Sequence, residues 1–374
     1  MTSREPGAVR LGLLMQRWSD PERPFGNLTP FARTVSMLAR AEGVSVLVIS
    51  PDEINQKADR VSGLKLTPGG GWAPAAGPFP DVIWNRYFRR DREELLQGLQ
   101  RRGILLLNET GLNKWDAYKL LESDPLLKEH LPETRLLKKG DEVLDLTAKY
   151  PYVFLKPVVG SVGRGIVRAS AQPTGLIRLE YAAAETGLPK VEEASPKALA
   201  RWIRDHEGTY IGQQGLDLQV FYGRAADVRV LVQKDGEGRW QLTGMGARVA
   251  APGRFTSNLH TGGNGVPIRL LAGAVFMEDP ECQEILELEL QALAVRTATL
   301  VESALGSMGE LGLDFGIDSR GQIWYIEQNA QPGRSLFEHL GREDLSELAH
   351  RRPIQYTRYL ARAKSARAAG HQET

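Results

Sequence analysis

The chain has 374 residues, 42% of them hydrophobic and 25% charged, which is ordinary composition for a globular protein of two or three domains. A formal net charge of +1 excludes a strong global field that would select nucleic acid or an anionic membrane. The single cysteine, Cys282, excludes an intrachain disulfide, and its helical context without a basic neighbour indicates an inert thiol. No apolar run approaches the roughly 18 residues of a membrane span, so we expect a soluble cytoplasmic protein.

Residues 10–110 alternate strand-like and helix-like segments. Apolar runs and helical spacing predict strands at 11–15, 44–49, 81–84 and 104–107, and helices over 29–43 and 91–102. Residues 64–80 are rich in Gly and Pro and are expected to form a loop. This alternation is typical of an open, mostly parallel α/β sheet. No G-x-G-x-x-G follows the first strand, so the dinucleotide-binding fingerprint is absent.

The rest of the chain is predicted to mix further strands with three helices. The helices are expected over 113–121, 196–206 and 280–307, and the strands over 152–157, from 210, over 227–232 and over 240–249. The stretch from His350 to Gln372 has six Lys or Arg and no acid. We interpret it as a solvated terminal helix, with binding of an acidic partner as the alternative.

Residues 312–333 predict two antiparallel strands that form a hairpin. A two-residue loop at Ser319-Arg320 would pair Asp318 with Gly321 and Asp314 with Tyr325. This register requires a loop with an even number of residues and no bulge. An odd loop or a bulge would point the side chains of one strand to the opposite face of the sheet.

Three potential metal ligands are expected on one face of this hairpin. Side chains alternate along a strand, so Tyr325, Glu327 and Asn329 should point the same way. Asp314 should then lie diagonal to Glu327, at roughly 7–8 Å. Two carboxylates and an amide oxygen suit a hard ion such as Mg²⁺, which is normally shared with substrate phosphates. The opposite face is apolar, which argues against a solvated edge as the alternative: it carries Leu311, Leu313, Phe315 and Ile317.

A lysine and a glycine-rich loop follow the strand at 152–157. Lys156 ends that strand, and an ammonium group is a good partner for phosphate. Gly160-Ser161-Val162-Gly163-Arg164-Gly165 would let backbone N–H groups approach an anion, although no Walker A lysine follows. A plain hairpin turn is the alternative.

Two arginines and a second glycine-rich loop add features of phosphoryl transfer. Arg229 and Arg248 lie on separate predicted strands, where each could stabilise a transferring phosphoryl group or form a surface ion pair. The loop from Asn258 to Gly265 is polar and rich in glycine, and an ordinary surface loop is its alternative.

The order of these motifs resembles the ATP-grasp superfamily. From about Leu112 to about Leu340 the chain is similar to the branch that includes the ribosomal-protein glutamate ligases. The whole chain resembles the YheC/YheD group, described as endospore coat-associated proteins. The resemblance implies an α/β fold in four parts: a pre-ATP-grasp domain (1–111), an ATP-grasp subdomain with the glycine flap (112–206), a subdomain with the metal site (207–350) and a basic tail (351–374).

The resemblance also assigns nucleotide contacts. Lys114 is implied as the first nucleotide-binding lysine, with Lys119 as the fallback, and Lys156 as the second. The implied flap over the phosphates contains Gly160, Ser161, Gly163 and Gly165. Gln213 and Gln214 fall at the hinge that reads adenine, where the family usually has a glutamate in place of Gln214. The nearest candidate for the acidic ribose ligand, displaced by one position, is Asp217.

Metal and catalytic roles follow from the same resemblance. Asp314, Glu327 and Asn329 match the Mg²⁺ ligands. Arg248 would face the transferred phosphoryl group, and Arg229 or Asn258 the acyl phosphate. His260 is a candidate general base, or else a loop hydrogen-bonder. Three residues that follow predicted strands of the first domain are candidate substrate contacts, because open sheets bind ligands at that edge: Arg17, Trp18 and Arg86.

The implied activity is ATP- and Mg²⁺-dependent ligation of a carboxylate to an amine, or less often a thiol, through an acyl phosphate. The implied partners are ATP and small-molecule or peptide substrates, with spore-coat proteins as a further candidate, and neither nucleic acid nor membrane. The resemblance extends the expected cytoplasmic location to spore association. Two alternatives are a nucleotide-binding spore-coat or structural protein without turnover, and a small-molecule kinase.

Overall fold

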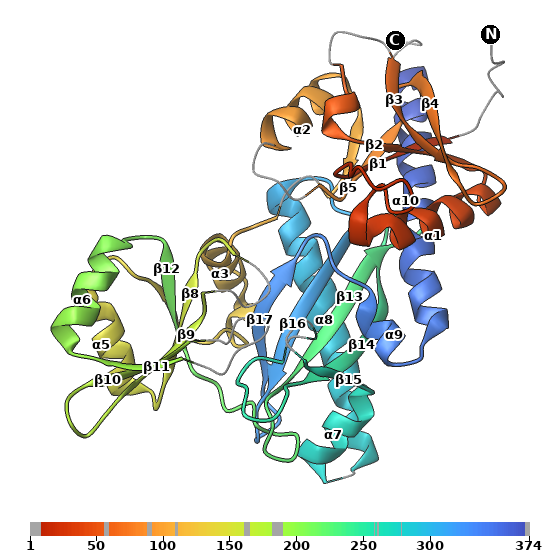
Figure 1. Ribbon diagram of the computed structural model, residues 1–374. Helices are drawn as coiled ribbons and strands as arrows, with labels where there is room; N and C mark the ends of the chain where they lie inside the picture. Colours follow the sequence, from red (N-terminus) through yellow and green to blue (C-terminus); the bar gives the residue numbers. More distant parts are fainter. Residues whose placement is uncertain are drawn as a thin grey trace.

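The computed structural model describes residues 9–55, 60–87, 92–108, 111–160, 165–181, 190–257, 259, 262–277 and 279–370. These residues form three sheets, each with its own apolar core (Figure 1). The α/β architecture inferred from the sequence is confirmed, and the sheets meet around a central cavity.

The first sheet is mixed, with the strand order β4-β3-β2-β1-β5-β6. The expectation of a mostly parallel sheet is confirmed for four of its strands, which are β1 (Val9–Leu14), β2 (Val44–Ile49), β5 (Val82–Asn85) and β6 (Leu105–Leu107). The helical segments of this domain are η1 (Gly26–Leu28), α1 (Thr29–Ala41), η2 (Pro51–Glu53) and α2 (Arg92–Arg101).

The expected loop at 64–80 is wrong. The chain there forms an antiparallel hairpin of β3 (Arg60–Leu66) and β4 (Trp72–Pro78). Pro74 and Pro78 are tolerated because β4 is the edge strand, where a missing N–H breaks no ladder. Gly63 is needed because a Cβ there would lie 2.3 Å from the carbonyl oxygen of Val48. In this hairpin the prolines therefore mark an edge strand, and Gly63 marks a close approach between two backbones.

The second sheet is antiparallel, with the order β11-β10-β9-β8-β12-β7. Its strands are β7 (Thr134–Leu136), β8 (Val153–Pro157), β9 (Val167–Ala171), β10 (Ile177–Tyr181), β11 (Val191–Ala194) and β12 (Tyr210–Gln214). Two helices, α5 (Gly140–Lys149) and α6 (Pro196–Asp205), supply buried side chains to its core. β12 pairs with β7 and β8, so this sheet extends past the expected boundary at residue 206.

The third sheet holds the predicted metal hairpin at one edge, in the order β15-β14-β13-β16-β17. Its strands are β13 (Ala226–Lys234), β14 (Trp240–Val249), β15 (Asn264–Val266), β16 (Glu310–Ile317) and β17 (Ile323–Asn329). One face packs on α7 (Ile268–Phe276) and α8 (Pro280–Leu305). The same core takes side chains from α3 (Lys114–Glu122) and α4 (Pro125–Lys128), although both precede the second sheet in the chain. The short helix α9 (Ser335–His339) lies on the other face, over β14 and β15.

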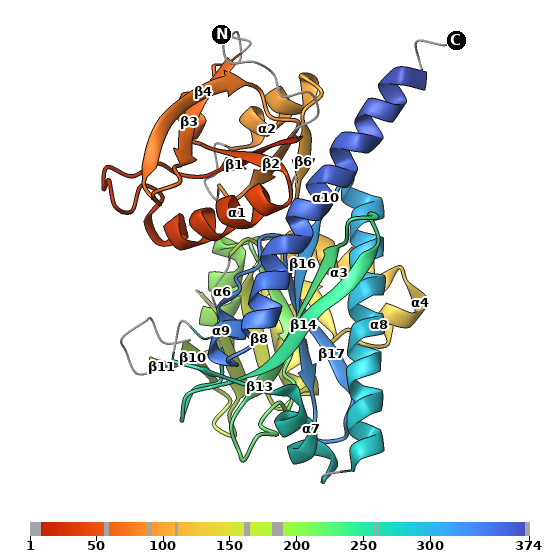
Figure 2. The same cartoon turned by 90° about the vertical axis from the view of Figure 1, so that its right-hand side faces the viewer.

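The basic C-terminal segment belongs to one long helix, α10 (Glu343–Gly370), which runs from the third sheet to the first domain (Figure 2). It contacts α1, β1 and β13. Ile354 and Tyr356 are 0% and 3% exposed in the core of the first domain, so this stretch is no separate solvated tail. None of the described helices is both long and apolar enough to cross a membrane.

Candidate active site

The loop of the metal hairpin differs from the expected one. The backbone N–H of Asp318 donates to the carbonyl of Gln322 at 3.1 Å across a three-residue loop, 319–321, and its C=O accepts from the N–H of Gly321 at 2.9 Å within that loop. Gly321 takes the left-handed conformation there, with φ of 81°, which suits a three-residue hairpin loop. The predicted two-residue loop is therefore wrong, and so is the Asp314–Tyr325 pair that depended on it.

A bulge at Ile326 compensates for the odd loop. Phe315 pairs with Tyr325, whereas Asp314 pairs directly with Glu327, which leaves Ile326 without a counterpart on β16, a strand described throughout. Tyr325 therefore belongs to the apolar core with Phe315, their ring centroids 6.3 Å apart. The expectation that Tyr325 shares a face with Glu327 is wrong, because the extra residue turns the strand over between them.

The three potential metal ligands nevertheless share the sheet face that lies away from the core. Asp314 is directly opposite Glu327 and not diagonal to it, and Gly312 pairs with Asn329 two residues further on. Asp314 is buried, Glu327 is half-buried and Asn329 is exposed. The oxygen donors thus run in a row from the interior of the sheet to its surface.

Two arginines hold the carboxylate of Asp314. Arg229 lies opposite it on β13 and donates to both of its oxygens, with Nη2 3.0 Å from Oδ2. Arg248 donates to both oxygens of Asp227 at 2.7 Å and lies 2.8 Å from Oδ2 of Asp314. Burial would raise the pKa of Asp314, but the charges of the two guanidinium groups hold it well below its usual range. Both arginines therefore stand beside the metal-ligand row, and Asp314 stays ionised.

Lys156 is buried on β8 and faces the same row. Its Nζ donates to Oε1 of Gln213 at 2.6 Å, and Gln213 in turn donates to Oγ1 of Thr134 at 2.9 Å. Burial lowers the pKa of Lys156 to about 8, with the carboxylate of Glu327 opposing that shift. The side chain of Gln213 is thus used to orient an ammonium group.

Lys114 approaches the site from the first turn of α3. That helix begins here because Asn113 caps it, with Oδ1 accepting from the N–H of Asp116 at 2.9 Å. The Nζ of Lys114 donates to the carbonyl of Gly160 at 2.7 Å, at the start of the glycine-rich loop. Burial lowers its pKa, and Glu327 opposes the shift. Lys119, the fallback, is exposed and pairs with Asp116 at 2.9 Å.

The remaining candidates divide between described and undescribed residues. Ser161, Gly163, Asn258 and His260 lie outside the described residues. Gly165 is described, with φ of 74°, which favours glycine at that position. The side chain of Gln214 accepts from the N–H of Glu133 at 3.1 Å, and so it serves the sheet. Asp217 lies close enough to Tyr152 to raise the pKa of that phenol, after the larger effect of burial.

Two cavities meet at this row of charges. A larger one of about 790 Å³ contains Lys114, Gly160 and Asn329 among its lining residues. A smaller cavity of about 140 Å³ lies at Gln213 and Gln214, the expected hinge, and Asp314 is also among its lining residues. Residues from both sheets line the two cavities together: Lys156, Gln213, Arg248, Ile326 and Glu327. Most of the described site residues named from the sequence line this cleft: Lys114, Lys156, Gly160, Gln213, Gln214, Arg229, Arg248, Asp314, Glu327 and Asn329. Gly165 and Asp217 are described but are not among its lining residues.

The smaller cavity has aromatic walls that the sequence analysis missed. Phe154 on β8 and Phe255, beyond β14, have ring centroids 5.8 Å apart. The guanidinium carbon of Arg168 lies 5.4 Å from the ring centroid of Tyr152 and 5.5 Å from that of Phe255. Aromatic residues spaced this far apart in sequence carry no local signal, because they are brought together only when the two sheets pack.

The first domain contributes to the larger cavity at its opposite end. Arg86 and Asn108, which follow β5 and β6, line that cavity. Among the described lining residues of the two cavities, Arg17 and Trp18 are not found. Arg17 pairs with Glu53 at 3.5 Å, and Trp18 is 61% exposed. The structure therefore brings one of the three candidate substrate contacts to the cleft.

The oxygen donors fit a divalent ion that is shared with another ligand. The described residues contain no group of three or more His, Cys, Asp or Glu side chains that could hold a metal alone. Asp314, Glu327 and Asn329 supply hard oxygens but fewer than the roughly six ligands that Mg²⁺ takes, so phosphate or water oxygens would complete the set. Burial, and then the charge of Asp314, raise the pKa of Glu327. A nearby cation would favour the ionised carboxylate.

Residues 103–360 match the family model described as YheC/D like ATP-grasp. The chain belongs to this family. A relative named "Endospore coat-associated protein YheD", from Bacillus subtilis (strain 168), is 31% identical over 349 residues, which cover 91% of this chain and 76% of YheD. "Endospore coat-associated protein YheC" from the same organism is 22% identical, over 83% of this chain and 85% of YheC. The resemblance drawn from the motifs is thereby confirmed.

Solved structures of ATP-grasp ligases share the fold over nearly the whole chain. The ATP-grasp ligase PsnB, complexed with a minimal precursor, has a TM-score of 0.54 at 14% identity, covering 93% of this chain and 99% of that one. D-cycloserine synthetase DcsG has a TM-score of 0.54 at 13% identity, with the same coverage. The VanG D-Ala:D-Ser ligase from Enterococcus faecalis has a TM-score of 0.54 at 14% identity, covering 94% and 99%. The fold class is therefore that of the ATP-grasp ligases.

Proposed function

We propose that this protein is an ATP- and Mg²⁺-dependent ligase that joins a carboxylate to an amine, or less often to a thiol. The observation that supports this most is the convergence on one cleft of Lys114 and Lys156 with Asp314, Glu327 and Asn329. Two ammonium groups opposite a row of oxygen donors match the charge pattern of a triphosphate with its cation.

The cavities suggest how the substrates are arranged. The aromatic walls of the smaller cavity suit a flat base, so the nucleoside binds there, beside the hinge. The triphosphate then lies over Lys156 and Lys114, beside Gly160. The larger cavity, which extends to Arg86 and Asn108 in the first domain, takes the carboxylate and the acceptor.

The reaction proceeds in two displacements. An oxygen of the substrate carboxylate attacks the γ-phosphorus of ATP, and ADP leaves with the electrons of the broken P–O bond. The acceptor nitrogen then attacks the acyl carbon, loses a proton and expels inorganic phosphate. Mg²⁺, when bound, supplies charge neutralisation for the phosphates. Lys114 and Lys156 orient phosphate oxygens, Arg248 faces the transferred phosphoryl group, and Arg229 or Asn258 stabilises the acyl phosphate.

Related structures support the nucleotide and the substrate class. PsnB has been solved with Mg and ADP, and with a precursor peptide and AMPPNP. A peptide is therefore a reasonable substrate for this chain as well. The names of YheD and YheC support a second candidate, a spore-coat protein that binds nucleotide without turnover.

ADP release with a panel of amino acids and small peptides tests the proposal. We expect ADP and an amide-linked product in equal amounts with the correct pair of substrates. Thermal stabilisation by Mg²⁺ and ATP without turnover for any acceptor would instead favour the nucleotide-binding coat protein. A stable phosphorylated product without an amide would identify a kinase.

A further inference from the structure

Asn108 follows β6 in the first domain and has all its side-chain hydrogen bonds directed at the metal hairpin. Its Oδ1 accepts from the backbone N–H of Gly309 at 2.7 Å and of Glu310 at 3.1 Å. Its Nδ2 donates to the carbonyl of Glu310 at 2.8 Å and to the carbonyl of Ala330. Two acceptor and two donor positions are the full capacity of an asparagine amide. The residue is 2% exposed.

These contacts tie together the two open ends of the hairpin. Glu310 begins β16, the strand of Asp314, and Ala330 directly follows Asn329 at the end of β17. β16 and β17 are antiparallel, so both contacts lie at the end remote from the loop. One side chain from another domain thus bridges the strands that carry the oxygen donors.

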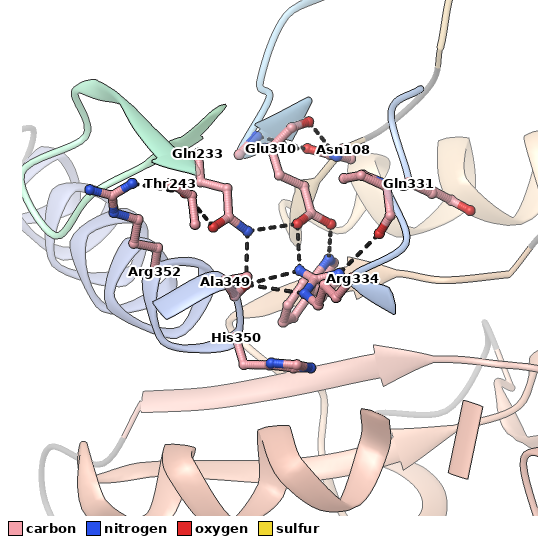
Figure 3. Close-up of polar contacts among 12 residues, drawn as sticks. Asn108, Gln233, Thr243, Glu310, Gln331, Arg334, Ala349, His350 and Arg352 are labelled. Carbon is pink, nitrogen blue, oxygen red and sulfur yellow. Dashed lines mark hydrogen bonds and ion pairs between the residues drawn. The ribbon is translucent and has the colours of Figure 1, made fainter. Parts of the chain in front are cut away.

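The anchor of this bridge is rigid, because the carboxylate of Glu310 is itself fully bonded (Figure 3). It accepts from Nε2 of Gln233 at 2.9 Å, Nη2 of Arg334 at 2.6 Å and Nε1 of Trp84 at 3.1 Å. Arg334 also donates to the carbonyl of Pro332 at 3.1 Å. The β16 side of the hairpin end is thereby held to the first domain through Trp84 and, through Arg334, to the turn that follows the ligands.

The backbone of Asn108 takes a conformation that is uncommon for residues other than glycine. Its φ is 61°, in the left-handed region that most residues avoid and asparagine tolerates. Asn108 also lines the larger cavity. The same residue therefore touches the ligand space, the first domain and the hairpin.

We propose that Asn108 is a positioning residue that sets the separation between Asp314 and Asn329, and so controls the affinity of the divalent-ion site. Its functional consequence rests on the proposed function, but the clamp itself does not. Mg²⁺ requires near-ideal octahedral geometry, and loss of an outer partner typically lowers metal affinity about 10–100-fold. The first domain would then act on the metal site without contacting the ion.

Asn108→Gly tests this, because glycine accepts the backbone conformation and removes only the amide clamp. Free Mn²⁺ would be titrated by electron paramagnetic resonance against the full chain with AMPPNP present. We expect at least about tenfold weaker Mn²⁺ binding in Asn108→Gly, with adenosine binding unchanged. Asn85→Ala is the matched control: Asn85 is buried at the end of β5, and its side chain accepts from the N–H of Tyr87.

Hydrogen exchange of the hairpin in the metal-free protein provides a second measurement. We expect faster exchange over 310–329 in Asn108→Gly and not in Asn85→Ala. Equal Mn²⁺ affinity in Asn108→Gly and wild type, or equal losses in both variants, would overturn the positioning role. Absence of Mn²⁺ binding by the wild type would instead refute the proposed function, and the exchange measurement would then decide the clamp alone.

Discussion

At the scale of single residues, the site is organised around a buried lysine. Lys156 is 8% exposed, and its pKa is lowered to about 8 mainly by burial. An ammonium group in such a position is costly unless an anion approaches it. Gln213 supplies one neutral acceptor at 2.6 Å, and the carboxylates of Glu327 and Asp314 act on the ammonium group through their charge alone among the described residues. The position of Lys156 therefore favours the binding of a ligand with negatively charged oxygen atoms.

ATP affinity is predicted to fall as the pH rises through the pKa of Lys156. Phosphate stabilises the protonated form, so binding above about pH 8 requires proton uptake and weakens with pH. The expected loss is roughly eightfold between about pH 7.5 and about pH 9. Isothermal titration of ATP would show it, and Lys156→Met should flatten the profile. A flat profile in the wild type would contradict this assignment.

Lys156→Ala is predicted to weaken ATP more than adenosine. In the proposed arrangement the lost ammonium group contacts the phosphates, whereas the base occupies the smaller cavity lined by Phe154 and Phe255. Competition binding of the two ligands measures the difference. Equal weakening would argue against a phosphate contact.

Glu327→Gln is predicted to reduce Mg²⁺-dependent ATP binding or turnover by at least about tenfold, or about 1.4 kcal/mol. The amide keeps the shape of the side chain but removes the charge that faces Asp314 across the hairpin. Titration of Mg²⁺ at fixed ATP gives the effect. Unchanged Mg²⁺ dependence would remove Glu327 from the metal site.

At the scale of elements, the hairpin shows what the sequence could and could not predict. The alternation of apolar and acidic residues gave both strands and the shared face of Asp314 and Glu327. It did not predict the register, because the three-residue loop and the bulge at Ile326 each shift the pairing by one residue in the same direction. The total shift of two residues changes the partner of Asp314 from Tyr325 to Glu327 but keeps Asp314 and Glu327 on one face. The aromatic cavity and the Asn108 clamp depend on contacts between distant segments, which leave no periodic trace.

Gly321→Ala is predicted to destabilise the hairpin. A left-handed backbone costs a residue with a Cβ about 1–2 kcal/mol, and that Cβ would also lie 2.6 Å from the ring of Phe276. Gly175→Ala is a matched control, since its φ is 78° and nothing lies within 4 Å of the added atom. Urea unfolding should show a larger loss for Gly321→Ala. Equal losses would mean that the contact with Phe276 relaxes freely.

At the scale of the whole molecule, α10 joins parts that the sequence reading had separated. Its basic composition suggested a solvated tail, yet several of its charges are used in contacts. Arg351 and Arg358 pair with Glu42 of the first domain at 2.9 Å. Ile354 and Tyr356 complete the apolar core beneath β1 and β5. Composition alone could not distinguish these uses, because the partners lie at the other end of the chain.

Truncation after His350 is predicted to unfold the first domain. Loss of Ile354 and Tyr356 removes two buried side chains, at roughly 2–5 kcal/mol each, from a total stability that is typically about 5–15 kcal/mol. Truncation after Ala366 is the control, since it keeps both. Calorimetry should show a lost or lowered transition for the shorter chain only, and identical transitions for the two would contradict the packing role of α10.

The same helix has a consequence for synthesis on the ribosome. Leu11 and Ile354 belong to one apolar core, so the core of the first domain cannot close until α10 has been translated and has left the ribosome. Domains made early usually fold early. Here the core of the nascent first domain would stay incomplete until α10 is translated and packs against β1.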